Sequence, residues 1–309
     1  MASKVKVEKK YTFSGHKDCV YTLEPADQPS VFFSGAGDGM VVRWDLSDPD
    51  NGDLIAKLPT SVYALKFLLE RKMLIIGQNY QGLHIVNYED KKEIASIKIT
   101  DNAIFDIDVY DKYCIVACGK GEIVIVDLAL LRIIKRLNVT SQNARAITIN
   151  HERKEAAIGF SDYKIRIIDL ENFEIKHTFE AHNNSVFTLQ YGPDKKTLIS
   201  AGRDARIRSW LIDGNYLKME DIPAHLYAIN NMVFHPNHQW FATCSMDKSI
   251  KLWDTRTMKL LKVIDKARHA GHGTSVNKLY WSAYQNWLVS CSDDRTISVW
   301  ELDMSALQA

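Results

Sequence analysis

The sequence predicts an all-β fold built from seven copies of one four-stranded unit. The segment GAGDGMVVRWD, which contains Trp44, returns six times in varied form along the chain. The positions equivalent to Trp44 are Asn87, Val126, Ile168, Trp210, Trp253 and Trp300, at intervals of 43, 39, 42, 42, 43 and 47 residues. Short apolar runs bounded by turn residues fill each copy, and no stretch has the 3.6-residue period of an amphipathic helix. A repeat of this length is typical of architectures made from stacked units.

Each copy contains four predicted strands in a fixed order. The first is an apolar run such as Val186-Leu189-Tyr191, and a turn rich in Pro, Asp, Asn and Lys follows it. The second run ends in small residues, as in TLISAG, and a tight turn around Asp leads to a third run with period-two alternation, as at Ile250 and Leu252. A weaker fourth run, such as EIKHTFE, closes the unit. Four short antiparallel strands cannot bury both faces alone, so the copies must stack.

Stacking of these units predicts a seven-bladed β-propeller with four-stranded antiparallel blades. We expect a single domain, residues 1–309, with blades at about 16–60, 61–101, 102–141, 142–181, 182–224, 225–271 and 272–303. The chain begins with KVKVEKKYTFSGH, which matches the fourth strand and the start of the next unit, and it ends just after a third strand at Trp300. An N-terminal strand within residues 4–14 is therefore expected to close the last blade and to cover a strand edge.

The bulk properties argue against nucleic acid and membranes as partners. The 309 residues are 46% hydrophobic and 25% charged, with a formal net charge of +1. The basic cluster Lys4, Lys6, Lys9 and Lys10 lacks interleaved aromatic residues, so we interpret it as a solvated start to the chain. The first residues contain no apolar stretch typical of a signal peptide, and no apolar run is long enough to span a bilayer. Five cysteines without a secretory signal predict free thiols and a cytoplasmic protein.

Four copies contain a histidine, a hydroxyl residue, an aspartate and a tryptophan spaced by 18, 4 and 6 residues. The sets are His16, Ser34, Asp38 and Trp44; His182, Ser200, Asp204 and Trp210; His225, Thr243, Asp247 and Trp253; and His272, Ser290, Asp294 and Trp300. Imidazole, hydroxyl and carboxylate are also the parts of a nucleophilic hydrolase site. A catalytic constellation is needed only once, whereas this set recurs with Ser and Thr interchanged. We therefore predict four structural tetrads and no catalytic residue.

These features resemble the WD-repeat (WD40) β-propeller family across the whole chain. Its signature pairs Gly-His near the start of a repeat with Trp-Asp near the end. The pairs present here are Gly15-His16, Gly271-His272, the variants Ala181-His182 and Ala224-His225, the intact Trp44-Asp45 and Trp253-Asp254, and the departures Trp210-Leu211 and Trp300-Glu301. The resemblance implies that each tetrad is a buried hydrogen-bond network. Copies two to four lack the set and carry residues such as Ile76, Gln81, Ala117 and Ile158, although Asp162 remains.

The resemblance also implies which residues reach the upper rim of the propeller. One lies just after the apolar anchor of each first strand, and another just before the turn aspartate. From these two sets we predict the partner-binding residues Tyr21, Tyr63, Tyr80, Phe105, Arg145, Phe187, Arg203, Asn230, Met246 and Asn277. Tyrosine and arginine are common in binding hot spots, and the rings could also cage a cation. Alternatively, some rings simply pack against neighbouring blades.

The sequence thus predicts a non-catalytic scaffold that binds one or more proteins or peptides on this rim, as a monomer or as a subunit of a complex. No metal or nucleotide motif is present, so no cofactor is expected. One alternative is a substrate receptor of a cullin-type ubiquitin ligase, because Trp253-Asp254-Thr255-Arg256 resembles the WD-x-Arg element of such receptors. Another is a small-molecule binder or enzyme that uses the mouth of the propeller channel.

Overall fold

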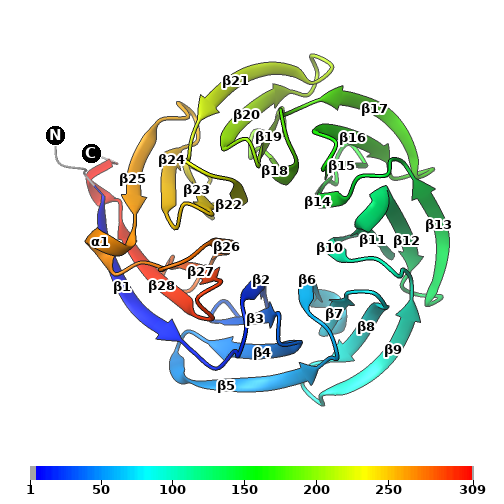
Figure 1. Ribbon diagram of the computed structural model, residues 1–309, viewed down its shortest axis with the longest axis horizontal. Helices are drawn as coiled ribbons and strands as arrows, with labels where there is room; N and C mark the ends of the chain where they lie inside the picture. The colour runs from blue at the N-terminus through cyan, green and yellow to red at the C-terminus, as the bar shows by residue number, and fades with distance from the viewer. Residues whose placement is uncertain (1–4, 308–309) are drawn as a thin grey trace. The chain divides into compact units, whose positions relative to one another are not determined.

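A computed structural model describes residues 5–307, which form seven four-stranded sheets (Figure 1). The predicted all-β, seven-bladed propeller fold is confirmed. The chain divides into two compact units, one made of residues up to Val62 together with those from Asn230 onward, and the other made of Tyr63–Ile229. Blades are numbered here in chain order, and the two units are described separately.

The unit Tyr63–Ile229 contains blades two to five, whose four strands follow one another in sequence order within each sheet. The strands are β6 (Val62–Leu68), β7 (Met73–Gln78), β8 (Gly82–Asn87), β9 (Lys92–Lys98), β10 (Ile104–Tyr110), β11 (Tyr113–Cys118), β12 (Glu122–Asp127), β13 (Arg132–Asn138), β14 (Ala144–Asn150), β15 (Glu155–Phe160), β16 (Lys164–Asp169), β17 (Glu174–Glu180), β18 (Val186–Tyr191), β19 (Thr197–Gly202), β20 (Arg206–Leu211) and β21 (Leu217–Pro223). Short 3-10 turns lie at η1 (Leu69–Arg71) and η2 (Gly119–Gly121).

Burial explains the different sequence patterns of the four strands in a blade. The second strands, such as β11 (YCIVAC) and β15 (EAAIGF), are buried along almost their whole length, because blades pack against both of their faces. The fourth strands, such as β13 (RIIKRLN), alternate between exposed and half-buried residues. Apolar runs therefore mark the middle of a blade, and alternation marks its outer edge.

The unit formed by the two ends of the chain contains blades one, six and seven. Its strands are β1 (Lys6–Phe13), β2 (Val20–Pro25), β3 (Val31–Ala36), β4 (Met40–Asp45), β5 (Asp48–Lys57), β22 (Ile229–Phe234), β23 (Trp240–Ser245), β24 (Ile250–Asp254), β25 (Leu260–Ile264), β26 (Val276–Trp281), β27 (Leu288–Ser292) and β28 (Ile297–Asp303). The helix α1 (Lys266–His269) precedes β26, and η3 (Ser305–Leu307) follows β28. Within residues 5–307, no helix has the length and apolarity needed to cross a bilayer.

The N-terminal strand completes the last blade, as predicted. β1 pairs antiparallel with β28, from Lys6 opposite Asp303 to Phe13 opposite Ile297 (Figure 1). Lys4, at the start of the predicted strand, lies outside the described residues. The side chain of Lys10 makes ion pairs with Glu8 and Glu301, at 3.1 and 3.4 Å between the charged atoms. Charged side chains on an outer strand discourage pairing with other chains.

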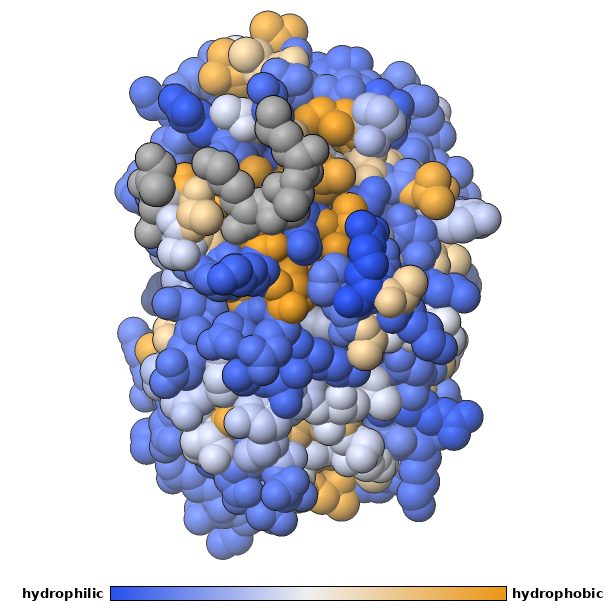
Figure 2. Space-filling model, turned by 90° about the vertical axis from the view of Figure 1, so that its left-hand side faces the viewer, coloured by the Kyte–Doolittle hydropathy of each residue, from blue (hydrophilic) through white to orange (hydrophobic). Residues whose placement is uncertain are grey.

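Hydrophobic surface is visible on the side of the molecule where β1 and β25 lie. Figure 2 views the molecule from the side where β1 and β25 lie in Figure 1, and it shows hydrophobic atoms with hydrophilic surface around them. The half-buried Val7, Leu261 and Leu307 pack against the core of blades six and seven. The closing strand therefore covers part of an apolar blade edge.

Candidate functional site

A β-bulge occurs near the start of the first strand in several blades. The pairing between first and second strands skips one residue after Val20, Ile104, Ala144, Val186 and Val276. The skipped residues are Tyr21, Phe105, Arg145, Phe187 and Asn277. A bulge bends the strand and turns the extra side chain out of the ladder. Five of the ten predicted rim residues are therefore bulge residues, a feature that repeat spacing alone did not reveal.

Backbone hydrogen bonds bring the second set of rim positions next to the bulges. The N–H of Ser161 donates to the carbonyl of Asn143 at 2.8 Å, two residues before Arg145. The N–H of Arg203 donates to Ser185 O at 2.9 Å, two residues before Phe187. The two predicted sets therefore lie side by side within blades four and five.

Four predicted rim residues form one continuous contact in the unit Tyr63–Ile229, which we call the rim column: Tyr63, Phe105, Arg145 and Phe187. The rings of Tyr63 and Phe105 stack with centroids 6.1 Å apart and an interplanar angle of 6°. The Cζ atom of Arg145 lies 4.1 Å from the ring centroid of Phe105 and 5.2 Å from that of Phe187. All four side chains are half-buried. Blades two to five thus present an aromatic surface with a guanidinium between two rings.

The guanidinium of Arg145 is held by one polar contact and perturbed by its surroundings. Its Nε donates to Ser161 Oγ at 3.1 Å. Burial lowers the pKa of Arg145, the Tyr63 hydroxyl acts in the opposite direction, and the charge of Arg203 lowers it further. The charge of Arg145 is thus partly desolvated and lies near a second cation.

The remaining predicted rim residues have other surroundings. In the unit formed by the chain ends, Asn230 Nδ2 donates to Ser275 Oγ at 2.9 Å, and Ser275 Oγ donates to Asn277 Oδ1 at 3.1 Å. Asn277 Nδ2 donates in turn to Asp293 Oδ1 at 2.8 Å and to Val20 O at 2.9 Å. These two amides therefore connect blades six, seven and one. Asn230 and Asn277 are half-buried, as is Tyr21, while Arg203 is exposed, Tyr80 is 60% exposed and Met246 is 53% exposed.

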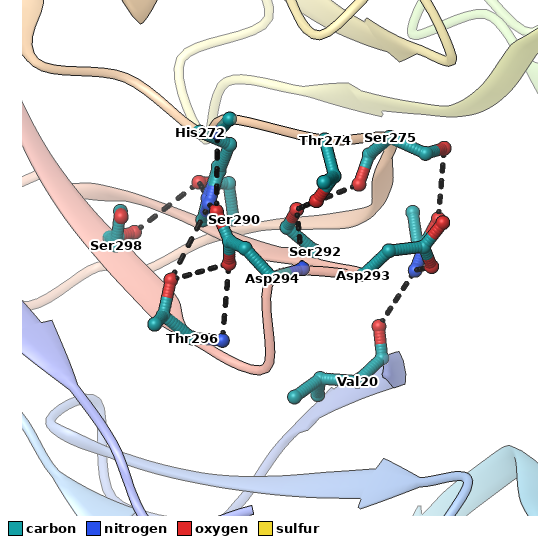
Figure 3. A network of polar contacts seen from close by, with 12 residues as sticks. Val20, His272, Thr274, Ser275, Ser290, Ser292, Asp293, Asp294, Thr296 and Ser298 are labelled. Carbon is teal, nitrogen blue, oxygen red and sulfur yellow. Dashed lines mark hydrogen bonds and ion pairs between the residues drawn. The ribbon is translucent and has the colours of Figure 1, made fainter. Parts of the chain in front are cut away.

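Three of the four predicted tetrads have hydrogen bonds between all their members. In blade seven, His272 Nδ1 lies 2.9 Å from Asp294 Oδ2 and Nε2 lies 2.9 Å from Ser290 Oγ (Figure 3). Trp300 Nε1 donates to the same Ser290 Oγ at 2.8 Å. The corresponding distances in blade five are 2.9, 2.8 and 2.9 Å, and those in blade one are 3.3, 2.7 and 2.8 Å. The three hydroxyl oxygens belong to fully buried serines. Each hydroxyl is therefore enclosed and engaged by two partners.

Blade six contains the hydrogen bond between the tryptophan and the hydroxyl residue of the tetrad. Trp253 Nε1 donates to Thr243 Oγ1 at 2.9 Å. Asp247 Oδ1 accepts hydrogen bonds from the N–H and the hydroxyl of Ser249, at 3.0 and 2.6 Å. The histidine of this predicted tetrad, His225, belongs to the unit Tyr63–Ile229. Arg256, in the turn after β24, is exposed.

Blades two to four replace the tetrad with other polar contacts, which the sequence comparison of repeats missed. In blade two, His84 lies 2.7 Å from Gln78 Oε1 and 2.8 Å from Glu93 Oε1. In blade three, Thr100 Oγ1 donates to Glu122 at 2.8 Å. In blade four, the retained Asp162 pairs with a guanidinium at 2.7 Å, that of Arg166. In the sequence, the arginine four residues after the retained aspartate could have indicated this ion pair.

Two hollows lie in the unit Tyr63–Ile229. One, of about 320 Å³, is mainly apolar and is lined by residues that include Leu68, Met73, Ile94 and Leu131. The other, of about 600 Å³, is polar and includes Lys120 and Glu122 among its lining residues: Lys98, Ile99, Thr100, Asp101, Asn102, Lys120, Glu122 and Arg136. Among residues 5–307, no three His, Cys, Asp or Glu side chains are grouped so that they could hold a metal ion.

Acid is expected to destabilise the tetrad of blade five. Burial alone would raise the pKa of Asp204, but hydrogen bonds from His182 and the N–H of Asn183, together with the charge of Arg208, lower it to about 2. Because the ordinary value is 3.8, the stabilisation is complete above about pH 4 and is lost as the pH falls toward 2. We expect the free energy of unfolding, measured with urea from about pH 5 to pH 2, to fall less steeply in Asp204→Asn than in the wild type. Parallel curves would contradict this assignment.

Comparisons with known proteins match this architecture. The family described as "WD domain, G-beta repeat" matches residues 7–45, 173–210, 217–254 and 263–301. The chain is 24% identical over 236 residues to a striatin homolog of Dictyostelium discoideum, covering 72% of this chain and 26% of that protein. It is 21% identical over 269 residues to the 66 kDa stress protein of Physarum polycephalum, covering 84% and 43%. It is 29% identical over 106 residues to actin-interacting protein 1 of Drosophila melanogaster, covering 33% and 17%.

The matches are uneven along the chain. The alignments span less than half the length of each of these relatives. The four family matches end at or just after Trp44, Trp210, Trp253 and Trp300, so they fall on the copies with a tetrad. Blades two and three and the first three strands of blade four lie outside the matches but form the same four-stranded sheets. The four matched repeats and the seven sheets show that the chain belongs to the WD-repeat β-propeller family.

Proposed function

We propose that this protein is a non-catalytic interaction platform that binds a peptide segment of a partner protein on the rim column. The observation that carries this proposal is the contact that runs from Tyr63 through Phe105 and Arg145 to Phe187. WD-repeat proteins commonly act as subunits of protein complexes, and the family assignment supports the same general role here.

The rim column has the physical properties of a binding hot spot. Aromatic and arginine side chains contribute most of the binding energy at many protein interfaces. Here they are half-buried and fixed by one another, so little side-chain entropy remains to be lost when a ligand binds. The bulges at Phe105, Arg145 and Phe187 place these side chains on rigid strands instead of mobile loops. The binding surface is thus preorganised before a ligand binds.

The tetrads supply the argument against catalysis as the main role. A nucleophilic hydroxyl must reach a substrate, yet Ser34, Ser200 and Ser290 are fully buried and each contacts both a histidine and an indole. At the rim, Asp293 accepts a hydrogen bond from Asn277. An enzyme at the mouth of the propeller therefore has weaker support than a binding platform.

The proposal also covers the cellular compartment and the oligomeric state of the protein. The described cysteines are free, and four of the five are buried. Free thiols are typical of a reducing compartment, so we place the protein in the cytoplasm. We propose that it is monomeric alone and that it joins complexes through its partner.

The test is a selection of peptides followed by measurement of their affinity. Linear 12-residue peptides displayed on phage are selected on the immobilised full chain, and the affinity of a selected peptide is measured by calorimetry. The variant Tyr63→Ala/Phe187→Ala is expected to bind it at least about 30-fold more weakly, because the loss of even one hot-spot side chain costs about 2 kcal/mol or more. The matched control Leu217→Ala/Met219→Ala, which changes two exposed residues on β21, is expected to bind like the wild type.

The outcome depends on the folded state of the variants. Melting curves must show that the double variant remains folded at the temperature of the binding measurement. If this folded variant binds every selected peptide as tightly as the wild type, the rim column is not the binding surface.

A further inference from the structure

The guanidinium of Arg145 has an unused edge. In the part of the chain that the structure describes, its side chain makes one hydrogen bond, from Nε to Ser161 Oγ at 3.1 Å. The two terminal nitrogens, which carry four N–H groups, have no acceptor among residues 5–307. The side chain is nevertheless half-buried between the rings of Phe105 and Phe187. These terminal N–H groups are therefore available to a ligand, and the flanking rings shield the charge from part of the solvent, which strengthens its attraction for an anion.

A second cation lies next to this edge without a carboxylate partner. Arg203 is exposed, and its backbone N–H is fixed to Ser185 O at 2.9 Å, close to Phe187. Among residues 5–307, the guanidinium of Arg203 makes no ion pair or hydrogen bond within the chain. The nearest rim carboxylate of blade four, Asp162, is already paired with Arg166 at 2.7 Å. Blades four and five therefore present two guanidinium groups, while their turn aspartates, Asp162 and Asp204, are engaged by Arg166 and His182.

We propose that the edge of Arg145, assisted by Arg203, binds the carboxylate of an aspartate or glutamate in the partner peptide, with Phe105 and Phe187 covering the neighbouring apolar atoms. This inference rests on the proposed function and names the chemistry of its ligand. A carboxylate is planar and can accept two parallel N–H bonds from one guanidinium edge. Since aromatic rings approach the guanidinium from both neighbouring blades, a flat ligand group that lies in its plane fits best.

A carboxylate fits better than a phosphate group. Phosphate sites usually combine several cations with backbone N–H groups that converge on the three free oxygens. Here two guanidinium groups are available, and the N–H groups of Ser161 and Arg203 already donate to Asn143 and Ser185. The peptide is therefore expected to be acidic but unphosphorylated, with an aromatic or aliphatic residue next to its acid.

The experiment combines the selected peptides with variants of both partners. Peptides selected from the 12-residue library on the full chain are expected to be enriched in Asp or Glu next to an apolar residue. Arg145→Met keeps an unbranched apolar side chain between the rings but removes the charge, and Arg203→Met does the same for the second cation. The affinity of a selected peptide for Arg145→Met is expected to fall about 10- to 100-fold, and Arg203→Met should lower it less, because a hydrogen bond to a charged group is stronger than a longer-range attraction. Arg256→Met, which changes an exposed arginine of the other unit, is the matched control.

A change in the peptide makes the result independent of the stability of the protein variants. Replacing the peptide's Glu with Gln should weaken binding to the wild type by at least the same factor, and its further effect on Arg145→Met should be no larger than the effect of Arg203→Met. Selected peptides without an acid, or a Glu→Gln peptide that binds the wild type unchanged, would overturn the carboxylate inference while leaving the rim column intact. A phosphoserine peptide that binds more than tenfold tighter than the Glu peptide would overturn it in favour of phosphate recognition. Peptides that bind equally to Tyr63→Ala/Phe187→Ala would instead overturn the proposed function.

Discussion

Replacing Ser290 with alanine is expected to lower the free energy of unfolding by about 2–4 kcal/mol, because two buried groups lose their partner at once. Ser290 Oγ accepts the indole N–H of Trp300 at 2.8 Å and lies 2.9 Å from His272 Nε2. With the histidine proton on Nδ1, facing Asp294, the hydroxyl donates to Nε2. Alanine leaves both the indole N–H and the imidazole nitrogen buried and unsatisfied. Urea unfolding at neutral pH measures the loss.

A matched control lies opposite Ser290 in the same blade. Ser298 pairs with Ser290 across β27 and β28 and is equally buried, but its Oγ has no hydrogen-bond partner. Ser298→Ala removes the same atom without leaving a partner behind, so it should change the free energy of unfolding by less than about 1 kcal/mol in either direction. If Ser290→Ala and Ser298→Ala proved equally stable, the tetrad would not be a structural brace.

Replacing Phe13 with alanine should cost about 3–5 kcal/mol of stability, since this ring joins the closing strand to the next blade. Phe13 is 2% exposed and ends β1, which pairs with β28 of blade seven. Its ring packs against Phe32 and Trp44 of blade one, with centroids 5.7 and 5.2 Å away. The variant leaves a cavity between the two blades, and the loss can be measured by urea unfolding.

Thr12 provides the control for the closing strand. It occupies the preceding position of β1 and is exposed, so Thr12→Ala should leave the free energy of unfolding within about 0.5 kcal/mol of the wild type. A Phe13→Ala variant as stable as Thr12→Ala would mean that β1 does not hold blades seven and one together.

The repeat pattern predicted the fold because each blade obeys the same packing rule. Buried second strands require apolar or small side chains along their whole length, so the seven copies kept a readable spacing even where the tetrad is absent. The same spacing placed β1 in the last blade. The tetrads could be predicted as sets because a hydrogen-bond network depends on a fixed distance between strand, turn and loop.

The rim column was only partly predictable. The repeat spacing predicted four separate rim residues, Tyr63, Phe105, Arg145 and Phe187. It did not predict that they stack, because stacking depends on how neighbouring blades approach each other. Likewise, the amides of Asn230 and Asn277 proved to hydrogen-bond across blades, and no repeat pattern distinguishes a structural amide from a binding one. Contacts between blades join residues about forty positions apart, which periodicity within one copy does not describe.

Amide hydrogen exchange of the full chain, with and without a selected peptide, tests most directly whether the rim column is the binding surface. The account predicts slower exchange in the segments that carry the column and its supports, residues 63–65, 100–105, 141–145, 161–163 and 183–187, with little change around the tetrad of blade seven. Protection confined to the apolar hollow near Leu68 and Leu131, or to the unit formed by the chain ends, would contradict it.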